Sequence, residues 1–374
     1  MSKRLLFVVS EDWYFVSHRL HLAIAAIKEG YEVTLLCRCN NHKQMVEDKG
    51  IQVIDWPLAR GSHNPFKELR ALFVLIKMFA AVRPNIIHAV AVKPVLYSSV
   101  AAKITRVKPR VFALGGLGYL FSSKRARARV LKLFVVTAYR FALAGKKTKL
   151  ILQNKDDVKV LLRANVIQKE KIKLIRGSGV DTTVFKPEQF KHVTPLVILP
   201  SRMLWDKGVG EFVECARLVR QSKKNVRFAL IGSPDLENPE SISIAQLKTW
   251  VSDGIVEWWG KRTDMPEVYK QSTVVCFPSY REGLPKTLLE AASCGKPIVA
   301  FNVPGCREIV IDGKNGFLVP FKNTEKLVDS INILLGDEQL RKKFGTFGRE
   351  KVVNEFSQER VVEETLDVWT EVLS

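Results

Sequence analysis

The apolar residues of this chain fall into short, continuous runs, and this pattern restricts the possible folds more than any other feature of the sequence. The runs are rich in Val, Ile and Leu and do not alternate with polar residues, as in Leu196 to Pro200 and Val274 to Pro278. Segments with helical spacing, such as Pro65 to Arg83, separate them. Strands of a parallel sheet covered by helices on both faces have this pattern. The sequence therefore predicts an α/β fold.

The predicted strands form two series. The first is at Arg4 to Ser10, Glu32 to Arg38, Gln52 to Trp56, Asn85 to Val90, Arg110 to Leu114, Leu150 to Gln153 and Lys173 to Arg176. The second is at Leu196 to Pro200, Val226 to Gly232, Val256 to Gly260, Val274 to Pro278, Pro297 to Phe301 and Phe317 to Val319. The early helices are expected at His18 to Glu29 and Pro65 to Arg83.

This arrangement predicts two doubly wound, Rossmann-like domains that face each other across a cleft, and 374 residues suit two such cores. We expect an N-terminal domain at residues 1–180, a linker at 181–195, a C-terminal domain at 196–355 and a final helix at 356–374 that would pack back on the N-terminal domain. Ligands of such sheets bind at the carboxyl ends of the strands.

The chain is strongly basic, with a formal charge of +21. Most of this charge comes from the 87 residues between Glu68 and Asp156, which contain eighteen Lys or Arg and no Asp or Glu. A polyanionic partner is expected, namely nucleic acid, an anionic membrane surface or a phosphorylated ligand. The basic stretch is not interleaved with aromatic platforms and shows no known reading helix, which disfavours nucleic acid.

Other bulk features indicate a cytoplasmic protein. No apolar run reaches the roughly 18 to 20 residues of a membrane-spanning helix, and the N-terminal apolar run is too short for a signal peptide. The six cysteines occur singly apart from Cys37 and Cys39, and we expect them to be free thiols.

Two motifs that follow apolar strands carry candidate chemistry. Arg202 and Lys207 lie between a strand and a helix, where a planar cation, a mobile cation and free helix amides suit a diphosphate. In the second motif, Pro285 marks the first turn of a helix, so Glu282 is in the loop and Glu290 is over one turn into the helix. The structural alternative is that all four are solvated surface charges.

These motifs resemble those of the family-4 retaining glycosyltransferases of the GT-B fold. The resemblance covers residues 196–335 and includes the E-x7-E pair, Gly295 to Ala300, Pro304 to Val310 and Gly313 to Val319. In the N-terminal half, Trp13 to Arg19, Gly30 to Val33 and Gly115 to Phe121 resemble a subgroup that builds bacterial surface polysaccharides on polyprenyl carriers.

The resemblance implies specific roles. Arg202 and Lys207 would bind the donor diphosphate and neutralise the charge of the leaving group. Glu282 would face the donor sugar together with the backbone amides of Gly283 and Leu284. Glu290 would bind the ribose hydroxyls, and the backbone around Arg262 would read the base, for which uracil is expected.

The N-terminal half departs from the family pattern. Many members have a glycine pair after the first strand, where this chain has Ser10 to Trp13. Many also have a histidine near the end of the fourth strand that touches the donor sugar, and His88 is close to that place. The further candidates for the acceptor site or cleft are His18, Arg19, Gly116 and Gly118.

These features predict metal-independent, retaining transfer of a hexose or N-acetylhexosamine from a UDP-sugar to a polyprenyl-diphosphate-linked saccharide. No D-x-D motif occurs, and Arg202 and Lys207 would replace a divalent ion at the diphosphate; neither a metal nor a cofactor is expected. The alternatives are a UDP-sugar epimerase of the same fold, a glycoside hydrolase that uses two glutamates, and a basic nucleic-acid-binding protein.

A lipid-linked acceptor requires that the enzyme reach the membrane. We expect peripheral binding to the inner face of the inner membrane through a segment that mixes basic and apolar residues with helical spacing. Its predicted contacts are Lys124, Arg125, Arg127, Arg129 and Lys132.

Overall fold

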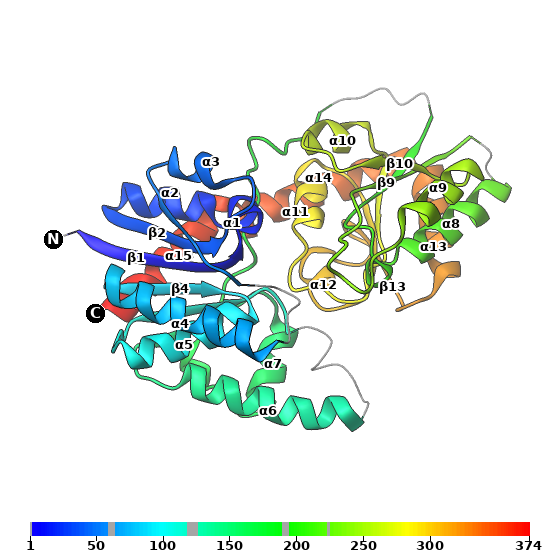
Figure 1. The fold of residues 1–374 in the computed structure, drawn as a ribbon. Helices are drawn as coiled ribbons and strands as arrows, with labels where there is room; N and C mark the ends of the chain where they lie inside the picture. Colours follow the sequence, from blue (N-terminus) through cyan, green and yellow to red (C-terminus); the bar gives the residue numbers. More distant parts are fainter. Residues whose placement is uncertain (1, 59–63, 118–125, 189–193, 223–224) are drawn as a thin grey trace. The chain divides into compact units, whose positions relative to one another are not determined.

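The computed structural model describes residues 2–58, 64–117, 126–188, 194–222 and 225–374 (Figure 1). The chain forms two compact units, one made of Met1–Ser178 with Glu359–Ser374 and the other of Gly179–Gln358. Each unit contains one parallel sheet with helices between successive strands. The predicted class of two Rossmann-like α/β domains is confirmed.

The sheet of the first unit has seven parallel strands in the order β3-β2-β1-β4-β5-β6-β7. Its strands are β1 (Lys3–Glu11), β2 (Tyr31–Arg38), β3 (Gln52–Asp55), β4 (Ile86–Val90), β5 (Arg110–Leu114), β6 (Thr148–Leu152) and β7 (Ile172–Leu174). Residues Leu5 to Val9 of the central strand β1 are fully buried. Burial on both faces explains why this strand is continuously apolar.

Helices of the first unit cover both faces of this sheet (Figure 1). They are α1 (Asp12–His18), α2 (Leu20–Lys28), α3 (Lys43–Glu47), α4 (Pro65–Val82), α5 (Val92–Ile104), α6 (Ala126–Leu143), α7 (Lys155–Arg163), the 3-10 turn η2 (Lys169–Lys171) and the C-terminal α15 (Gln358–Leu373). The cores of α1, α2 and α15 pack on one face, and those of α4, α5 and α6 pack on the other.

The sheet of the second unit has six parallel strands in the order β10-β9-β8-β11-β12-β13. Its strands are β8 (Leu196–Pro200), β9 (Arg227–Ile231), β10 (Glu257–Gly260), β11 (Val274–Phe277), β12 (Ile298–Phe301) and β13 (Gly316–Val319). Its helices are η3 (Trp205–Lys207), α8 (Val209–Ser222), α9 (Ile244–Ser252), α10 (Met265–Gln271), α11 (Lys286–Ser293), α12 (Cys306–Ile309), α13 (Thr324–Gly336) and α14 (Glu338–Glu355).

The helix predicted near His18 to Glu29 corresponds to α2, and the sequence analysis did not include the short helix α1 that precedes it across the non-helical backbone of Arg19 (φ −136°, ψ −12°). The start of the predicted linker at 181–195 is part of the second unit, because the Arg349 guanidinium donates hydrogen bonds to the carbonyls of Thr182 (2.9 Å) and Phe185 (2.7 Å).

The C-terminal helix α15 packs on the first unit. Val361, Val368, Trp369 and Val372 are buried in the same core as β1 and β2. Near its end, the Glu371 carboxylate lies 2.6 Å from Lys149 Nζ and 2.8 Å from Lys173 Nζ. The chain therefore enters the second unit after Ser178 and returns to the first unit at Glu359.

Among the described residues, no helix combines the length and the apolar character that a membrane crossing requires. Their six cysteines are free, in agreement with the sequence prediction, and burial raises the pKa of Cys215 and of Cys294 to about 12.

Candidate functional site

The polar residues predicted for the donor site lie at the carboxyl edge of the second sheet. Arg202 follows β8, Lys207 ends the turn η3, Arg262 follows β10 and Glu282 follows β11. Because all six strands are parallel, their carboxyl ends share one edge, where α/β sheets bind ligands. The topology therefore gathers residues that are up to 80 positions apart in the sequence.

Lys207 and Glu282 form a largely buried ion pair at this edge. Lys207 Nζ lies 2.6 Å from Glu282 Oε1, and both side chains expose 15% or less of their surface. The Ser279 hydroxyl donates a second hydrogen bond, of 2.7 Å, to the same carboxylate oxygen. Charge-assisted hydrogen bonds of this length fix both groups in place.

A glycine makes this pair possible. Gly208 has a φ of +73°, and a Cβ atom at this position would lie only 2.0 Å from the carbonyl oxygen of Pro278. The adjacent backbone is fixed by a 2.9 Å hydrogen bond from the Tyr280 amide to the Asp206 carbonyl. The turn that carries Lys207 is thus in direct contact with the loop that carries Glu282.

Arg202 is held by an acid that the sequence analysis missed. Its Nη1 atom lies 2.7 Å from Asp235 Oδ2, and 43% of the arginine side chain is exposed. Asp235 follows β9, which is the neighbour of β8. Its place shortly after a strand was the available signal, because polar residues at such positions collect at the same edge of a parallel sheet.

Glu290 is buried in the second turn of α11. Tyr269 donates a 3.0 Å hydrogen bond to its Oε2, and Lys286 Nζ lies 3.7 Å from its Oε1. Burial raises the pKa of Glu290, although Lys286 and Tyr269 partly counteract this effect. Pro285 is the N-cap residue, immediately before the first helical residue Lys286, whereas the sequence predicted Pro285 to lie in the first turn.

The backbone of the Glu282 loop is covered by the loop after β12. Gly305 has a φ of +83°, and a Cβ atom there would lie 2.7 Å from the Gly283 carbonyl and 2.9 Å from that of Glu282. Leu284 is 9% exposed and belongs to the core of the unit. This packing fixes the position of the loop.

Arg262, predicted near the base, is paired with Asp264. Its Nε donates a 2.7 Å hydrogen bond to Asp264 Oδ1, and its Nη2 contacts the other carboxylate oxygen. The guanidinium carbon also lies 5.9 Å from the ring centre of Trp259. Arg262 and Trp259 at the end of β10 thus offer a planar cation and an indole ring on which a flat ring can stack.

The candidates of the first unit occupy different environments. The His18 ring stacks on Tyr14 with centres 4.4 Å apart and an angle of 9°. Arg19 is buried at the break between α1 and α2 and donates a 2.9 Å hydrogen bond to the His18 carbonyl. Gly116 follows β5 with a φ of +149°, whereas Gly118 lies outside the described residues.

His88, a candidate for the acceptor site or cleft, is a buried core residue of the first unit. It is 1% exposed on β4, its ring centre lies 5.2 Å from that of Phe7, and Trp369 Nε1 donates a 3.0 Å hydrogen bond to its Nδ1. Burial holds the pKa of His88 well below its usual value, and the charge of Arg19 lowers it further. The sequence could not show this, because α15, which covers His88, lies 281 residues away.

The segment from Ser10 to Trp13, which replaces the family's glycine pair, organises the neighbouring loop. The buried carboxylate of Asp12 accepts hydrogen bonds from the amides of Trp13 (2.7 Å), Asn40 (2.7 Å) and His42 (3.0 Å). Burial alone would raise the pKa of Asp12, but these hydrogen bonds lower it below its ordinary value of 3.8. Asp12 thus fixes the loop after β2.

The predicted membrane contacts lie outside the part of the chain whose side chains the structure describes. Lys124 and Arg125 lie outside the described residues. Arg127, Arg129 and Lys132 are on α6, but the description of side chains on this helix begins at Val135.

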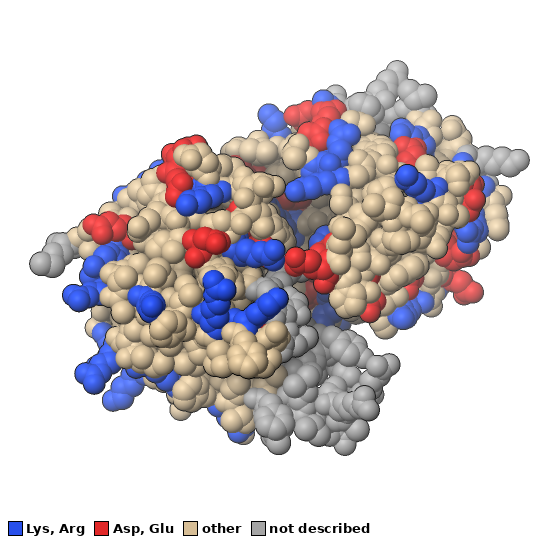
Figure 2. Space-filling model, in the orientation of Figure 1, with Lys and Arg blue, Asp and Glu red and all other residues tan. Residues whose placement is uncertain are grey.

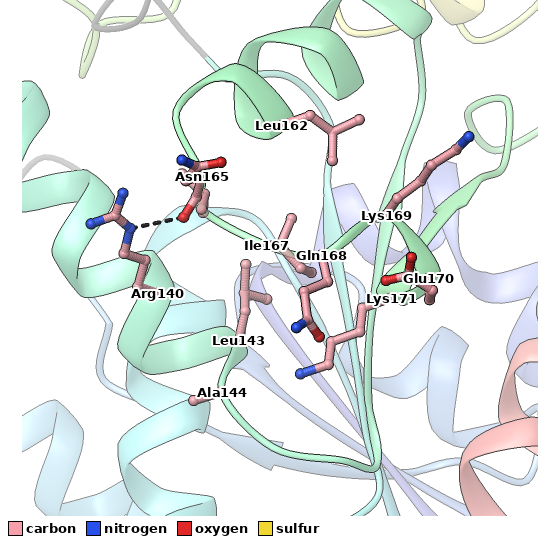
Figure 3. A pocket seen from close by; sticks show the side chains of 11 residues that line it. Arg140, Leu143, Ala144, Leu162, Asn165, Ile167, Gln168, Lys169, Glu170 and Lys171 are labelled. Carbon is pink, nitrogen blue, oxygen red and sulfur yellow. Dashed lines mark hydrogen bonds between the residues drawn. The ribbon is translucent and has the colours of Figure 1, made fainter.

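A groove of about 570 Å³ lies elsewhere in the first unit (Figure 3). It is lined by residues from the end of α6 and from the segment between α7 and β7, and Arg140 at its rim donates hydrogen bonds to the carbonyls of Asn165 and Ala164. These residues precede β6 and β7, so the groove lies at the amino edge of the sheet, opposite the edge where ligands of such folds bind.

Comparisons with known proteins agree with this geometry. The family model described as glycosyl transferases group 1 matches residues 180–351, and the one described as glycosyl transferase 4-like matches residues 4–154. The first model lies within the second unit and the second model within the first unit, and together the two models span most of the chain. This chain belongs to the glycosyltransferases.

Individual relatives and solved structures show which glycosyltransferases this chain resembles. It is 29% identical over 323 residues to the N,N'-diacetylbacillosaminyl-diphospho-undecaprenol alpha-1,3-N-acetylgalactosaminyltransferase of Campylobacter jejuni, with 83% of each chain covered. The glycosyltransferase of Rickettsia africae superposes with a TM-score of 0.80 at 19% identity and full coverage of both chains. HepE of Anabaena, solved with UDP-glucose, gives 0.76 at 20% identity and covers 97% of this chain and 99% of that one. The fold is that of the GT-B glycosyltransferases.

Proposed function

We propose that this glycosyltransferase moves a hexose or N-acetylhexosamine from a UDP-sugar to a polyprenyl-diphosphate-linked saccharide, with retention of configuration and without a metal ion. The observation that carries the proposal is the Lys207–Glu282 ion pair, which lies at the carboxyl edge of the second sheet together with Arg202. The relative from Campylobacter jejuni is named for a diphospho-undecaprenol acceptor, and HepE was solved with UDP-glucose. Both names support the substrate classes.

The chemistry follows from the charges at this edge. Arg202 and Lys207 would bind the donor diphosphate and stabilise the negative charge that grows as the bond to the sugar C1 breaks. The acceptor hydroxyl forms its bond to C1 on the same face, and its proton passes to the leaving diphosphate oxygen, so the products are the new glycoside and UDP. Glu282 orients the sugar and stabilises its cationic character. No carboxylate nucleophile is required.

The remaining residues of the edge would hold the rest of the donor. Glu290 would accept hydrogen bonds from the ribose, since its buried carboxylate already has Tyr269 and Lys286 to fix its position. The amides of Gly283 and Leu284 would contact the sugar, and the backbone near Arg262 would read uracil. Metal independence rests on the two cations, which supply the charge that a divalent ion would otherwise provide.

The acceptor is expected to come from the cytoplasmic face of the inner membrane. The acid-free stretch from residue 69 to residue 155 supports binding to an anionic lipid surface, because each cation near such a surface contributes about 1 kcal/mol. Lys124, Arg125, Arg127, Arg129 and Lys132 would make the electrostatic part of this contact.

A transfer assay tests the proposal. The protein is incubated with a panel of radiolabelled UDP-sugars and polyprenyl-diphosphate-linked saccharides, with and without excess chelator, and the product linkage is analysed by NMR. We expect one donor to give an α-linked product from its α-linked sugar nucleotide in the presence of chelator. Conversion of the UDP-sugar without an acceptor would instead identify an epimerase. Activity that chelator abolishes and manganese restores would refute metal independence.

A further inference from the structure

Helix α4 carries a second apolar stripe that the core does not use. Its inner face packs on the sheet through Ala71, Leu75 and Phe79, which are spaced by four residues and are buried. On the opposite side, Phe66, Leu69 and Phe73 expose 81%, 63% and 56% of their surface. At 3.6 residues per turn these three side chains share one face of the helix. Clustered exposed apolar side chains of this kind mark interaction surfaces.

Cations lie along one side of this outer stripe. Lys67, Arg70 and Lys77 of the same helix are exposed, and Lys77 Nζ lies 4.6 Å from the ring centre of Phe73. In Figure 2, Lys and Arg side chains are visible with surface of uncharged residues between them on the side of the first unit that carries α4.

The acid of α4 does not offset these charges. The Glu68 carboxylate lies 3.0 Å from Lys93 Nζ of α5 and also accepts a hydrogen bond from the Tyr97 hydroxyl. It is therefore neutralised within the unit. The outer face of α4 presents three apolar anchors and a net positive charge.

The position of α4 connects this face to the expected acceptor. The helices α4, α5 and α6 share one hydrophobic core on the same face of the sheet (Figure 1). They follow β3, β4 and β5 in the chain, so their N-terminal ends lie at the carboxyl edge of the sheet.

We propose that α4 is a bilayer-inserting element: Phe66, Leu69 and Phe73 enter the boundary between headgroups and acyl chains of an anionic membrane, and Lys67, Arg70 and Lys77 bind the headgroups. Interfacial helices combine an apolar stripe with flanking cations in this way. The inference rests on the proposed function, since a lipid-linked acceptor requires that the enzyme reach the bilayer. A contact between two copies through this face is disfavoured, because two-fold symmetry would place the same cations opposite each other.

Vesicle sedimentation separates insertion from electrostatic attraction. The variant with Phe66→Ser, Leu69→Ser and Phe73→Ser keeps every charge, and we expect its affinity for vesicles of phosphatidylethanolamine and phosphatidylglycerol to fall more than tenfold, most clearly at 0.5 M salt, which screens the charges to roughly a 4 Å range. The matched control replaces Leu236, Ile244 and Ile333, which are exposed apolar residues of the second unit, by Ser. Circular dichroism and thermal unfolding verify that both variants are folded.

A fluorescence measurement gives an independent readout. In the Phe73→Trp variant, vesicles that contain brominated lipid should quench more emission than they do in the wild type. Wild-type affinity of the triple-serine variant, or no additional quenching, would overturn the inference. A concentration-dependent dimer that the triple-serine variant abolishes, without vesicle binding by the wild type, would also overturn it.

The two proposals fail separately. Transfer to a short-chain polyprenyl-diphosphate acceptor in detergent should be the same for the triple-serine variant and the wild type. If the wild type binds vesicles through α4 but transfers no sugar to any acceptor of this class, the proposed function fails and the inserting element stands.

Discussion

At the scale of single residues, Lys207 offers the sharpest test of the donor site. Because its Nζ is 2.6 Å from Glu282 and largely buried, its charge is positioned before any donor binds. Lys207→Ala should lower the turnover number more than tenfold, which corresponds to about 1.4 kcal/mol of transition-state stabilisation. The control is Lys326→Ala, which removes an exposed cation of the same unit. Steady-state rates at the wild-type level in a folded Lys207→Ala protein would remove Lys207 from the mechanism.

His88 should make the stability of the protein depend on pH. In the unfolded chain this side chain binds a proton below its ordinary pKa of about 6.5, whereas burial, together with the charge of Arg19, keeps it neutral in the folded state. The unfolded state therefore binds more protons below pH 6.5, and the free energy of unfolding falls there by up to about 1.4 kcal/mol per pH unit from this group.

Urea unfolding at pH 7.5, 6.5 and 5.5 measures this effect. The His88→Gln variant should have a smaller loss of stability between pH 6.5 and pH 5.5 than the wild type. Equal losses in the two proteins would show that His88 does not control acid sensitivity in this range.

At the scale of secondary-structure elements, the attachment of α15 is expected to depend on packing more than on charge. Trp369 is fully buried against Phe7 and His88, and Trp369→Ala should lower the free energy of unfolding by about 3 to 5 kcal/mol. Glu371 forms two ion pairs near the surface, and Glu371→Ala should cost less than about 1 kcal/mol. Denaturant unfolding of both variants gives the comparison, and a larger effect of Glu371→Ala would contradict this account.

At the scale of the whole molecule, the two units should differ in their ability to fold alone. The core of the second unit consists only of residues between Val180 and Phe356, whereas a core of the first unit requires Val361, Val368, Trp369 and Val372 of α15. A fragment of residues 179–358 should therefore unfold cooperatively in calorimetry and bind UDP without transferring sugar. A fragment of residues 1–178 should aggregate in size-exclusion chromatography unless residues 359–374 are supplied. A soluble, cooperatively unfolding 1–178 fragment would show that α15 is dispensable.

The sequence by itself determined the two-sheet architecture, because burial on both faces of a strand requires a local run of apolar residues. It also placed Arg202, Lys207 and Glu282 at strand ends, and parallel topology then brings such ends together. Only the tertiary structure decided the partners of these residues. Asp235 beside Arg202 and Gly208 against Pro278 depend on which strands become neighbours.

The same holds for His88 and Asp12. His88 has the polarity of a ligand-binding side chain, and its burial follows from a helix at the other end of the chain. Asp12 lies in the Ser10 to Trp13 segment that follows β1, and its contribution to ordering the loop at Asn40 and His42 depends on the pairing of β1 with β2. Periodicity along the chain records how each segment is buried, but it carries no information on which distant segment buries it.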